Sequence, residues 1–323
     1  MAKVDIFVPA ALSPKVMAGL ESAFVVHRGW EAADADALIN EIAGKARGIA
    51  LLHSAKADRA LIERLPELEI ISKLGVGYDS VDVEAAAERG IIVTNTPDVL
   101  TEEVADTAIA LLMMTAREHP SAERYLRAGR WASEGPYPLT RATMRNRTVG
   151  IVGLGRIGLA IARRLDAMLL PVVYNNRNPR NDVAYRHYGD AKAMAKDVDT
   201  IIVVLPGGAE TRNLVDAELL KALGPNGILI NIGRGSTVDE PALIEALQNR
   251  TIFAAGLDVF ATEPKVPDAL LALPNAVLLP HVASASIHTR DAMGQLVVDN
   301  LVSWFDDGKP LTAVPETPWP RSQ

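Results

Sequence analysis

Gly153-Leu154-Gly155-Arg156-Ile157-Gly158 is the stretch of this sequence that decides the fold we expect. The residues before it, Val149–Val152, are typical of a short strand, and Leu159–Met168 after it has helical spacing. Glycines in such a turn let the backbone approach a pyrophosphate closely, and the helix amino terminus offers unpaired N–H groups. The order of strand, glycine turn and helix predicts a dinucleotide site at all six residues, with a merely structural turn as the alternative.

The residues that follow this turn continue the alternation of strands and helices. Short β-branched and apolar runs predict further strands at Val172–Tyr174, Thr200–Val204, Ile228–Asn231, Ala254–Leu257 and Ala276–Leu279. The stretches between them have helical character. This alternation predicts a parallel sheet covered by helices on both faces.

The first hundred residues show a second series of the same kind. Strands are predicted at Val4–Val8, Ile49–Leu52, Ile70–Leu74 and Ile91–Asn95. Helices are predicted between them at Ser13–Glu21, Asp34–Ala43, Asp58–Arg64 and Val81–Arg89. The fold class is therefore α/β, with two doubly wound parallel sheets.

The segments between and after the two series define the expected domains. Thr101-Glu102-Glu103 opens a helix predicted to reach Arg117, Pro120 begins another that ends near Gly129, and Trp131–Arg147 is interpreted as a connecting loop. Ser286–Trp304 is predicted to be a long helix that returns to the first domain. A chain of 323 residues exceeds one compact core. We expect one domain of residues 1–100 and 286–323, and a second of residues 101–285.

Composition excludes several classes of function. The chain has 33 Lys and Arg against 40 Asp and Glu, a formal charge of −7, which has the wrong sign for a nucleic-acid binder. It has no cysteine, so thiolate catalysis and cysteine metal sites are excluded. No signal peptide and no apolar run long enough for a membrane span is evident. We expect a cytoplasmic protein without nucleic-acid or membrane partners.

The end of the second strand after the turn indicates which dinucleotide is bound. An NAD site usually places an acid there to bind the ribose 2′-hydroxyl. This chain has Asn176 and Arg177 instead, with Arg180 nearby and no carboxylate between Leu169 and Asn181. A guanidinium binds a 2′-phosphate in bidentate fashion. The pattern predicts NADP(H) preference, with Arg177 as the main contact, and leaves NAD(H) or mixed use as the alternative.

Three polar residues follow strands of the second series, where a parallel sheet places its ligands. They are Arg234, Glu263 and His281. Reduction of a 2-oxo acid needs a proton at the carbonyl oxygen once hydride reaches carbon, and a histidine can supply it near neutral pH. A carboxylate beside the imidazole favours its charged form, and an arginine can orient the substrate carboxylate. The sequence therefore offers one complete set of groups for this reaction.

Each of the three residues has a simpler interpretation. His281 could be a buried histidine or a helix cap, Arg234 could touch only the cofactor phosphate, and Glu263 before Pro264 could be a turn residue. The other histidines lack metal-ligand spacing and are interpreted as structural or surface groups: His27, His53, His119, His187 and His288. No metal site is predicted.

Lys73-Leu74-Gly75-Val76-Gly77-Tyr78-Asp79 is a second glycine-rich turn that follows a predicted strand. Its backbone N–H groups could hold an anion, either phosphate or carboxylate. A plain tight turn explains the same residues equally well.

Five motifs in this order resemble the D-isomer-specific 2-hydroxyacid dehydrogenases. They are Leu74–Asp79, Gly153–Gly158, Ile230–Gly235, Gly256–Phe260 with Glu263-Pro264, and Leu279–His281. The similarity runs from about Val4 to Trp304, and Ile92–Ala116 and Leu229–Glu240 look most like the glyoxylate/hydroxypyruvate reductases, including hydroxy(phenyl)pyruvate reductases.

The resemblance implies a flavodoxin-like substrate-binding domain, a Rossmann domain, a catalytic site in the cleft and a homodimer. It implies that Arg234, Glu263 and His281 are catalytic, that Val76 and Gly77 amides hold the substrate carboxylate, and that Asp258 faces the nicotinamide. The full set of expected substrate contacts is Leu74, Val76, Gly77, Arg234 and His281. The expected cofactor contacts beyond the turn are Asn176, Arg177, Leu205, Pro206, Thr211, Ile232, Gly233, Arg234, Asp258, His281 and Ser284.

The leading functional hypothesis is NADPH-dependent reduction of glyoxylate or hydroxypyruvate to glycolate or D-glycerate. A second is a broader 2-oxo acid reductase acting on phenylpyruvate-type or 2-ketogluconate-like substrates. A third, from another class, is a dinucleotide-sensing binding protein similar to the C-terminal-binding corepressors. The loop Trp131–Leu139 lies where related reductases contribute a side chain of the partner subunit to the pocket. Simple packing at an interface explains the aromatic residues of this loop as well.

Overall fold

The structure is a computed structural model that describes residues 3–52 and 55–320. It divides into two compact units, one made of the chain up to Leu100 together with the chain from Ala285 onward, and the other of Thr101–Ser284. The second segment of the first unit thus begins one residue before the position expected from the sequence. Each unit has its own sheet and its own apolar core.

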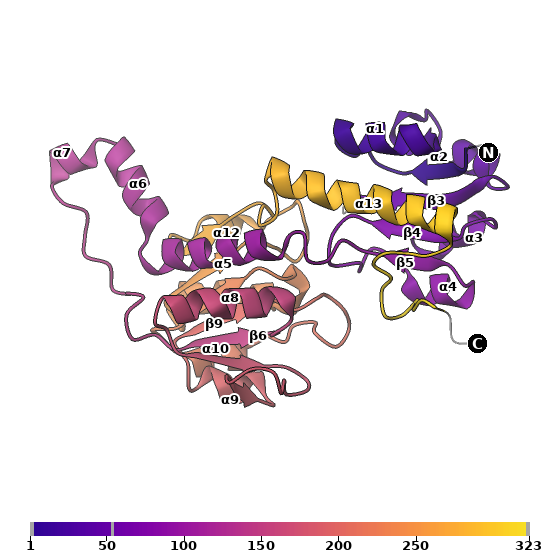
Figure 1. Ribbon diagram of the computed structural model, residues 1–323. Coiled ribbons are helices and arrows are strands. Elements are labelled where there is room, and N and C mark those ends of the chain that lie inside the picture. The colour runs from indigo at the N-terminus through magenta and orange to yellow at the C-terminus, as the bar shows by residue number, and fades with distance from the viewer. Residues whose placement is uncertain (1–2, 53–54, 321–323) are drawn as a thin grey trace. The chain divides into compact units, whose positions relative to one another are not determined.

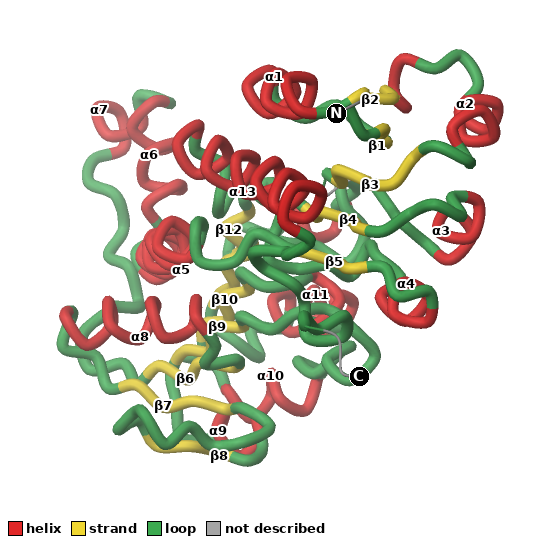
Figure 2. The backbone as a smooth tube through the Cα atoms, turned by 45° about the vertical axis from the view of Figure 1, so that its right-hand side comes forward, coloured by secondary structure: helices red, strands yellow, loops and turns green. Residues whose placement is uncertain are grey.

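The first unit is built on a five-stranded parallel sheet in the order β2-β1-β3-β4-β5 (Figure 2). Its strands are β1 (Asp5–Val8), β2 (Val25–Arg28), β3 (Ala46–Leu51), β4 (Ile70–Lys73) and β5 (Ile92–Thr94). Its helices are α1 (Pro14–Ala23), α2 (Ala35–Ile42), α3 (Arg59–Arg64), α4 (Val83–Glu88) and α13 (Ile287–Asp307), with a 3-10 turn η1 (Gly29–Glu31). This is the flavodoxin-like strand order.

The second unit is built on a seven-stranded parallel sheet in the order β12-β11-β10-β9-β6-β7-β8. Its strands are β6 (Val149–Val152), β7 (Val172–Asn175), β8 (Arg186–Tyr188), β9 (Thr200–Val203), β10 (Ile228–Asn231), β11 (Ala254–Leu257) and β12 (Ala276–Leu278). Numbered from β6, this is the doubly wound Rossmann order, which reverses direction at β6.

The helices of the second unit cover its sheet, except for two that leave it. They are α5 (Thr101–Ala116), α6 (His119–Arg127), α7 (Arg130–Glu134), α8 (Arg156–Ala167), α9 (Ala191–Ala195), α10 (Ala217–Leu223), α11 (Glu240–Gln248) and α12 (Asp268–Leu271), with a 3-10 turn η2 (Gly235–Thr237). Helices α5 and α8 pack against each other, whereas α6 and α7 project away from the sheet of this unit (Figure 1).

Local sequence explains where many helices begin. Aspartate side chains accept hydrogen bonds from the first free backbone N–H groups of six helices, as is usual for N-caps. These aspartates are Asp34, Asp58, Asp82, Asp190, Asp216 and Asp239. Because the central strands β6, β9 and β10 are buried on both faces, nearly all of their residues are apolar. The parallel sheets and the α/β class predicted from the sequence are confirmed.

Apart from shifts of a few residues at element ends, such as the start of β3 at Ala46 instead of Ile49, four differences from the expected elements have a local reason. Two short edge strands, β2 and β8, are not predicted by the sequence, because their polar and partly exposed residues lack the apolar pattern of the central strands. The interpretation of Trp131–Arg147 as loop throughout is wrong, since α7 covers its first residues. There Arg130 forms an ion pair with Glu134 one turn later, at 2.7 Å, and stacks on the Tyr125 ring.

The fourth difference is at the carboxyl end of the long last helix. Helix α13 runs to Asp307 rather than Trp304, so the first residues of the expected tail are helical. Gly308 then ends the helix in the left-handed conformation, with φ 65°. None of the helices in the described ranges is both long and apolar enough to cross a bilayer.

Candidate active site

The turn between β6 and α8 has the geometry that a pyrophosphate needs. Gly153 has a positive φ of 101°, and a Cβ on Gly158 would lie only 2.3 Å from the Gly153 carbonyl oxygen. These two glycines are therefore required by the turn itself. Gly155 is different, because a Cβ there would meet no atom within 4 Å. It caps the amino terminus of the twelve-residue helix α8 without any side-chain cap, so a phosphate can approach the helix N–H groups at this point.

Residues after β7 hold this turn in place. The Leu154 N–H donates to Asn176 Oδ1 at 2.7 Å, and the Leu154 carbonyl accepts from Arg180 Nη1 at 2.9 Å. His187 in turn contacts the Asn176 carbonyl at 2.9 Å. Asn176 thus orients the backbone of the glycine turn, a role that the sequence alone did not indicate.

Arg177 lies beside this turn on the surface. Its guanidinium forms an ion pair with Glu210, and both side chains are about three-quarters exposed (77% and 75%). An ion pair this exposed contributes little to stability, so the guanidinium can exchange Glu210 for a more highly charged partner. Glu210 comes from the loop after β9 and was missed in the sequence, because nothing in its local context marks it.

The loop after β9 also packs against the glycine turn. Leu205 and the Val204 backbone lie against Gly153, at 3.0–3.1 Å from the position of a Cβ. Thr211 Oγ1 donates to the Pro206 carbonyl at 2.8 Å and fixes the exposed part of the loop. The expected contacts Leu205, Pro206 and Thr211 therefore belong to one loop at the carboxyl edge of the sheet.

Arg234 is presented by a tight turn after β10. Asn231, which is 1% exposed, accepts from the Gly233 N–H at 3.1 Å and donates to the Arg234 carbonyl at 2.9 Å. The flanking glycines are needed for packing, since a Cβ would lie 2.6 Å from the Leu205 carbonyl oxygen at Gly233 and 1.8 Å from the Phe260 carbonyl carbon at Gly235. The glycines on either side of Arg234 in the sequence thus have a steric reason.

Asp258 at the end of β11 holds the segment that carries His281. Its backbone carbonyl accepts from the His281 N–H at 2.9 Å, and its carboxylate accepts from the Val282 and Ala283 N–H groups at 2.8 and 3.0 Å. Burial raises the pKa of the Asp258 carboxyl above its ordinary value, although these two amides oppose the shift. Its side chain is fully buried, so the structure gives it a positioning role; the expected nicotinamide contact stays a prediction.

Glu263 and His281 form the polar pair of the site. His281 Nδ1 lies 2.7 Å from Glu263 Oε2, and Glu263 Oε1 accepts from the Phe260 N–H at 3.0 Å. Burial would raise the pKa of Glu263, but the hydrogen bonds from His281 and Phe260 and the charges of His281 and Arg234 lower it overall. The carboxylate is therefore ionised at neutral pH and fixes the imidazole through Nδ1.

His281 itself has an unusual backbone conformation. Its φ of 53° lies in the left-handed region, which is uncommon for a residue with a Cβ. Such strained conformations persist where the surroundings hold them, and they cluster at functional sites. The Asp258 contacts and the Glu263 bond supply that restraint. The interpretation of His281 as a fully buried histidine is wrong, because its side chain is 38% exposed, and it is not a helix cap, because Ser286 caps the helix that follows.

The substrate contacts expected at Leu74, Val76 and Gly77 lie in the first unit, after β4. Gly75 has a φ of 131°. Its N–H donates to Thr96 Oγ1 at 2.9 Å, and its carbonyl oxygen accepts from the Thr96 N–H, also at 2.9 Å. The Val76 carbonyl accepts from Asn95 Nδ2 at 2.8 Å. The loop is thus shaped by the segment after β5, which lies about twenty residues further along the chain.

The remaining predicted residues need only brief placement. Ile232 is buried and bonds to the Val203 carbonyl at 3.1 Å, and Ser284 is the last residue of the second unit. Arg156 and Ile157 begin α8. Within the described ranges, no three His, Asp or Glu side chains gather as metal ligands, and His53 lies outside those ranges.

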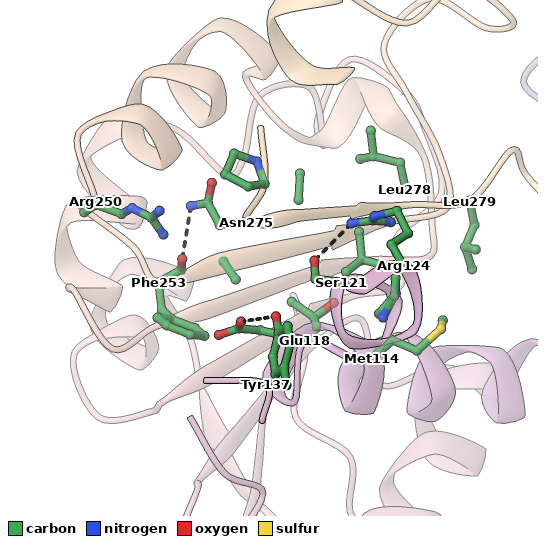
Figure 3. A pocket seen from close by; sticks show the side chains of 16 residues that line it. Met114, Glu118, Ser121, Arg124, Tyr137, Arg250, Phe253, Asn275, Leu278 and Leu279 are labelled. Atoms are coloured by element: carbon green, nitrogen blue, oxygen red, sulfur yellow. Dashed lines mark hydrogen bonds between the residues drawn. The ribbon is translucent and has the colours of Figure 1, made fainter. Parts of the chain in front are cut away.

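One cavity of the second unit lies away from these residues. Its volume is about 450 Å³, and it lies between α5, α6 and the start of β12 (Figure 3). Tyr137 donates to Glu118 Oε2 across it at 3.0 Å, and Arg124 donates to Ser121 Oγ at 3.0 Å. None of Arg234, Glu263 and His281 lines it. This cavity is therefore separate from the three candidate catalytic residues.

Comparison with known proteins agrees with this geometry. Residues 109–283 match the family model for the D-isomer specific 2-hydroxyacid dehydrogenase, NAD binding domain. The chain is 42% identical to the glyoxylate/hydroxypyruvate reductase A HPR2 of Arabidopsis thaliana, over 97% of this chain and 100% of the relative. It is also 42% identical to the hydroxyphenylpyruvate reductase of Plectranthus scutellarioides, over 96% of this chain and 98% of the relative.

A solved structure is similar over the entire length. The NADPH-dependent glyoxylate/hydroxypyruvate reductase SmGhrB from Sinorhizobium meliloti, in complex with NADP and malonate, is 53% identical, covers 100% of both chains and has a TM-score of 0.95. These findings favour the enzyme over the corepressor-like hypothesis, and they confirm the family expected from the motifs. The chain belongs to the D-isomer specific 2-hydroxyacid dehydrogenases and is an NAD(P)-dependent oxidoreductase of that family.

Proposed function

We propose that this protein reduces glyoxylate and hydroxypyruvate to glycolate and D-glycerate with NADPH. The observation that carries this proposal is the 2.7 Å pair between His281 Nδ1 and Glu263, presented at the same sheet edge as Arg234 and the glycine turn. The names of the relatives in Arabidopsis thaliana and Sinorhizobium meliloti support the substrate class.

The turn after β6 fits a dinucleotide. The open space at Gly155 and the uncapped amino terminus of α8 suit a pyrophosphate, and Arg177 suits the 2′-phosphate of NADP(H). We assign cofactor contacts to the glycine turn, Asn176, Arg177, Leu205, Pro206, Thr211, Ile232, Gly233, Arg234, Asp258, His281 and Ser284. When bound, the reduced nicotinamide supplies a hydride to the carbonyl carbon of the substrate.

The side chains of this chain then account for binding and proton transfer. Arg234 binds the substrate carboxylate and carbonyl oxygen and so fixes the orientation of the reacting carbon. His281 gives a proton to the carbonyl oxygen as negative charge develops there. Its Nδ1 is engaged by Glu263, so the proton comes from Nε2. Glu263 favours the protonated imidazole that is needed for reduction. In the first unit, the amides of Val76 and Gly77 bind the substrate carboxylate, and Leu74 is a further substrate contact.

A broader substrate range is the second candidate. The relative from Plectranthus scutellarioides is named a hydroxyphenylpyruvate reductase, and it matches as well as the Arabidopsis thaliana one. In this case the space beside Arg234 would accept the aryl group of a phenylpyruvate-type substrate. The choice between the two candidates depends on relative rates with small and large 2-oxo acids.

The test is a steady-state assay of the purified protein with glyoxylate, hydroxypyruvate and phenylpyruvate, each with NADPH and NADH. We expect the highest kcat/KM for one of the two small acids with NADPH. A higher kcat/KM for phenylpyruvate selects the broader reductase, and a clear preference for NADH overturns the cofactor assignment. Absence of turnover with every pair overturns the proposed function.

We further propose that the protein acts as a homodimer. Three large apolar side chains on or beside the projecting segment α6–α7 are exposed: Leu126, Trp131 and Leu139. Large exposed apolar side chains on a projecting segment suit an association surface. Light scattering coupled to gel filtration tests this, with twice the chain mass of 34.6 kDa expected and a monomer mass contradicting it.

A further inference from the structure

Lys73 is a buried charged residue that the proposed mechanism does not use. It is the last residue of β4 and only 2% exposed. Lysine is almost never buried to this degree, because removing an ammonium group from water is costly. Its position directly before the loop Leu74–Asp79 places this charge at the carboxyl edge of the first sheet.

The Lys73 ammonium group holds the base of that loop. Its Nζ donates to the Leu74 carbonyl oxygen at 3.1 Å. The peptide that follows is held at its other side, because the Gly75 N–H donates to Thr96 Oγ1 at 2.9 Å. Since a trans peptide is planar with its C=O and N–H opposed, these two contacts fix the direction in which the loop leaves the strand.

The next two peptides are aimed by the same principle. The Gly75 carbonyl accepts from the Thr96 N–H at 2.9 Å, so the Val76 N–H must point the other way. The Val76 carbonyl accepts from Asn95 Nδ2 at 2.8 Å, which directs the Gly77 N–H in the same manner. Three successive carbonyl groups are thus held, and two successive amides are directed away from them, as in an anion-binding nest.

We propose that Lys73 is a positioning residue for the substrate carboxylate: its buried ammonium group fixes the first peptide of the loop and adds positive charge to the site where the Val76 and Gly77 amides bind the anion. This inference rests on the proposed function of that loop. The proposal explains why a lysine occupies a position where an apolar residue could be buried at a lower cost in free energy. It assigns Lys73 a role in binding the substrate, measured by KM, and not in proton transfer.

The test compares three substitutions at Lys73 with a matched control on the same strand. Lys73→Met removes charge and donor, Lys73→Gln keeps a neutral donor, and Lys73→Arg keeps both. Ser72→Ala is the control, because Ser72 is 1% exposed, bonds to the Val297 carbonyl at 3.1 Å and points to the opposite face of the sheet. The measured quantities are kcat, both KM values, and the inhibition constant of oxalate, a two-carbon dicarboxylate probe.

We expect Lys73→Met to raise the KM for glyoxylate and the inhibition constant of oxalate by about 10–100-fold, the value of a hydrogen bond to a charged group. The KM for NADPH and the kcat should stay near wild type. Lys73→Gln should lie between Lys73→Met and Lys73→Arg, and Lys73→Arg and Ser72→Ala should retain the wild-type KM for glyoxylate.

Two results would overturn the proposal. One is a folded Lys73→Met or Lys73→Gln protein with an unchanged KM for glyoxylate. The other is failure of all three variants to fold, which makes Lys73 structural. If Lys73→Met alone fails to fold, the comparison of Gln with Arg decides. A wild-type protein that turns over no 2-oxo acid refutes the proposed function and this inference with it, whereas an active wild type with unaffected variants refutes the inference alone.

Discussion

The two glycine-rich turns, Gly153–Gly158 in the second unit and Leu74–Asp79 in the first, both follow a buried parallel strand but are held differently. In the first of these, packing and backbone conformation decide the shape, since a Cβ on Gly158 would collide with the Gly153 carbonyl oxygen, and Gly153 has a positive φ of 101° and tight contacts with the Val204 backbone. In the other, a Cβ on Gly75 would meet nothing closer than 3.6 Å, and donors from Lys73, Asn95 and Thr96 decide the shape.

This difference suggests that the two units have different functions. A turn fixed by glycine packing at a helix amino terminus presents a rigid set of N–H groups to a phosphate. The shape of a loop that is fixed by side-chain donors can be changed by substituting one of those side chains. We therefore expect changes in the second unit to affect the cofactor and the chemical step, and changes around the first loop to affect binding of the 2-oxo acid.

The largest expected effect is that of His281→Ala in the second unit. Loss of the proton donor should lower kcat for glyoxylate reduction by about 10²–10⁴-fold, the usual contribution of general acid catalysis. The dissociation constant of NADPH, measured by fluorescence titration, should change little. An unchanged kcat would remove His281 from the mechanism.

The glycine turn offers a pair of substitutions that separates folding from binding. Gly155→Ala should preserve Tm, because no atom lies within 4 Å of the new Cβ, yet weaken NADPH by about 10–100-fold by blocking hydrogen bonds to the phosphates. Gly158→Ala should lower Tm as well, since its Cβ would lie 2.3 Å from a carbonyl oxygen. Calorimetry measures the Tm of both variants, and titration measures their affinity for NADPH. Equal Tm losses would contradict the packing argument.

Arg177→Ala should raise the KM for NADPH by about tenfold and leave that for NADH nearly unchanged, because only NADP(H) carries the 2′-phosphate. Its control is Glu210→Gln, which removes the competing partner of the guanidinium and should lower the KM for NADPH by a few-fold, the scale of an exposed ion pair. Equal losses for NADPH and NADH in Arg177→Ala would count against a 2′-phosphate contact.

The smallest effect concerns the pH dependence of the Glu263–His281 pair. The folded pKa of Glu263 lies below its ordinary 4.5, so its stabilising contribution is present above 4.5 and is lost as pH falls through the folded value. Glu263→Gln should therefore be less stable than wild type at neutral pH, by about 1 kcal/mol or less because the pair is partly exposed. Thermal unfolding from pH 7 to pH 3 measures the difference. A gap that widens below pH 4.5 would contradict the assignment.

The sequence predicts much of the fold because central parallel strands are buried on both faces and so read as apolar runs. It predicts β6, β10 and β11 with their observed ends for this reason. Strands β2 and β8 lie at sheet edges, where partly exposed polar residues hide the pattern. Helix α7 is short and depends on the Arg130–Glu134 pair and on Tyr125, so no periodicity marks it.

Site residues divide in the same way. Arg234, Glu263 and His281 follow strands, and parallel topology places strand ends at one sheet edge, so sequence reasoning could find them. The contacts that hold the segment of His281 join residues far apart in the chain, Asp258 with Val282 and Ala283, and the Arg177 ion pair with Glu210 is equally distant in sequence. No local pattern encodes such pairs. The hydrogen bond from Lys73 Nζ to the Leu74 carbonyl joins adjacent residues, but the sequence does not show that the lysine side chain turns back to its neighbour's backbone.

In the proposed reaction, the second unit directs a hydride from NADPH to the carbonyl carbon of a 2-oxo acid. The most direct measurement reduces hydroxypyruvate with NADPH that carries deuterium at both C4 positions of the nicotinamide, followed by mass spectrometry of the product. Direct hydride transfer yields glycerate with one deuterium, on C2. Glycerate without deuterium, or no glycerate at all, would contradict it.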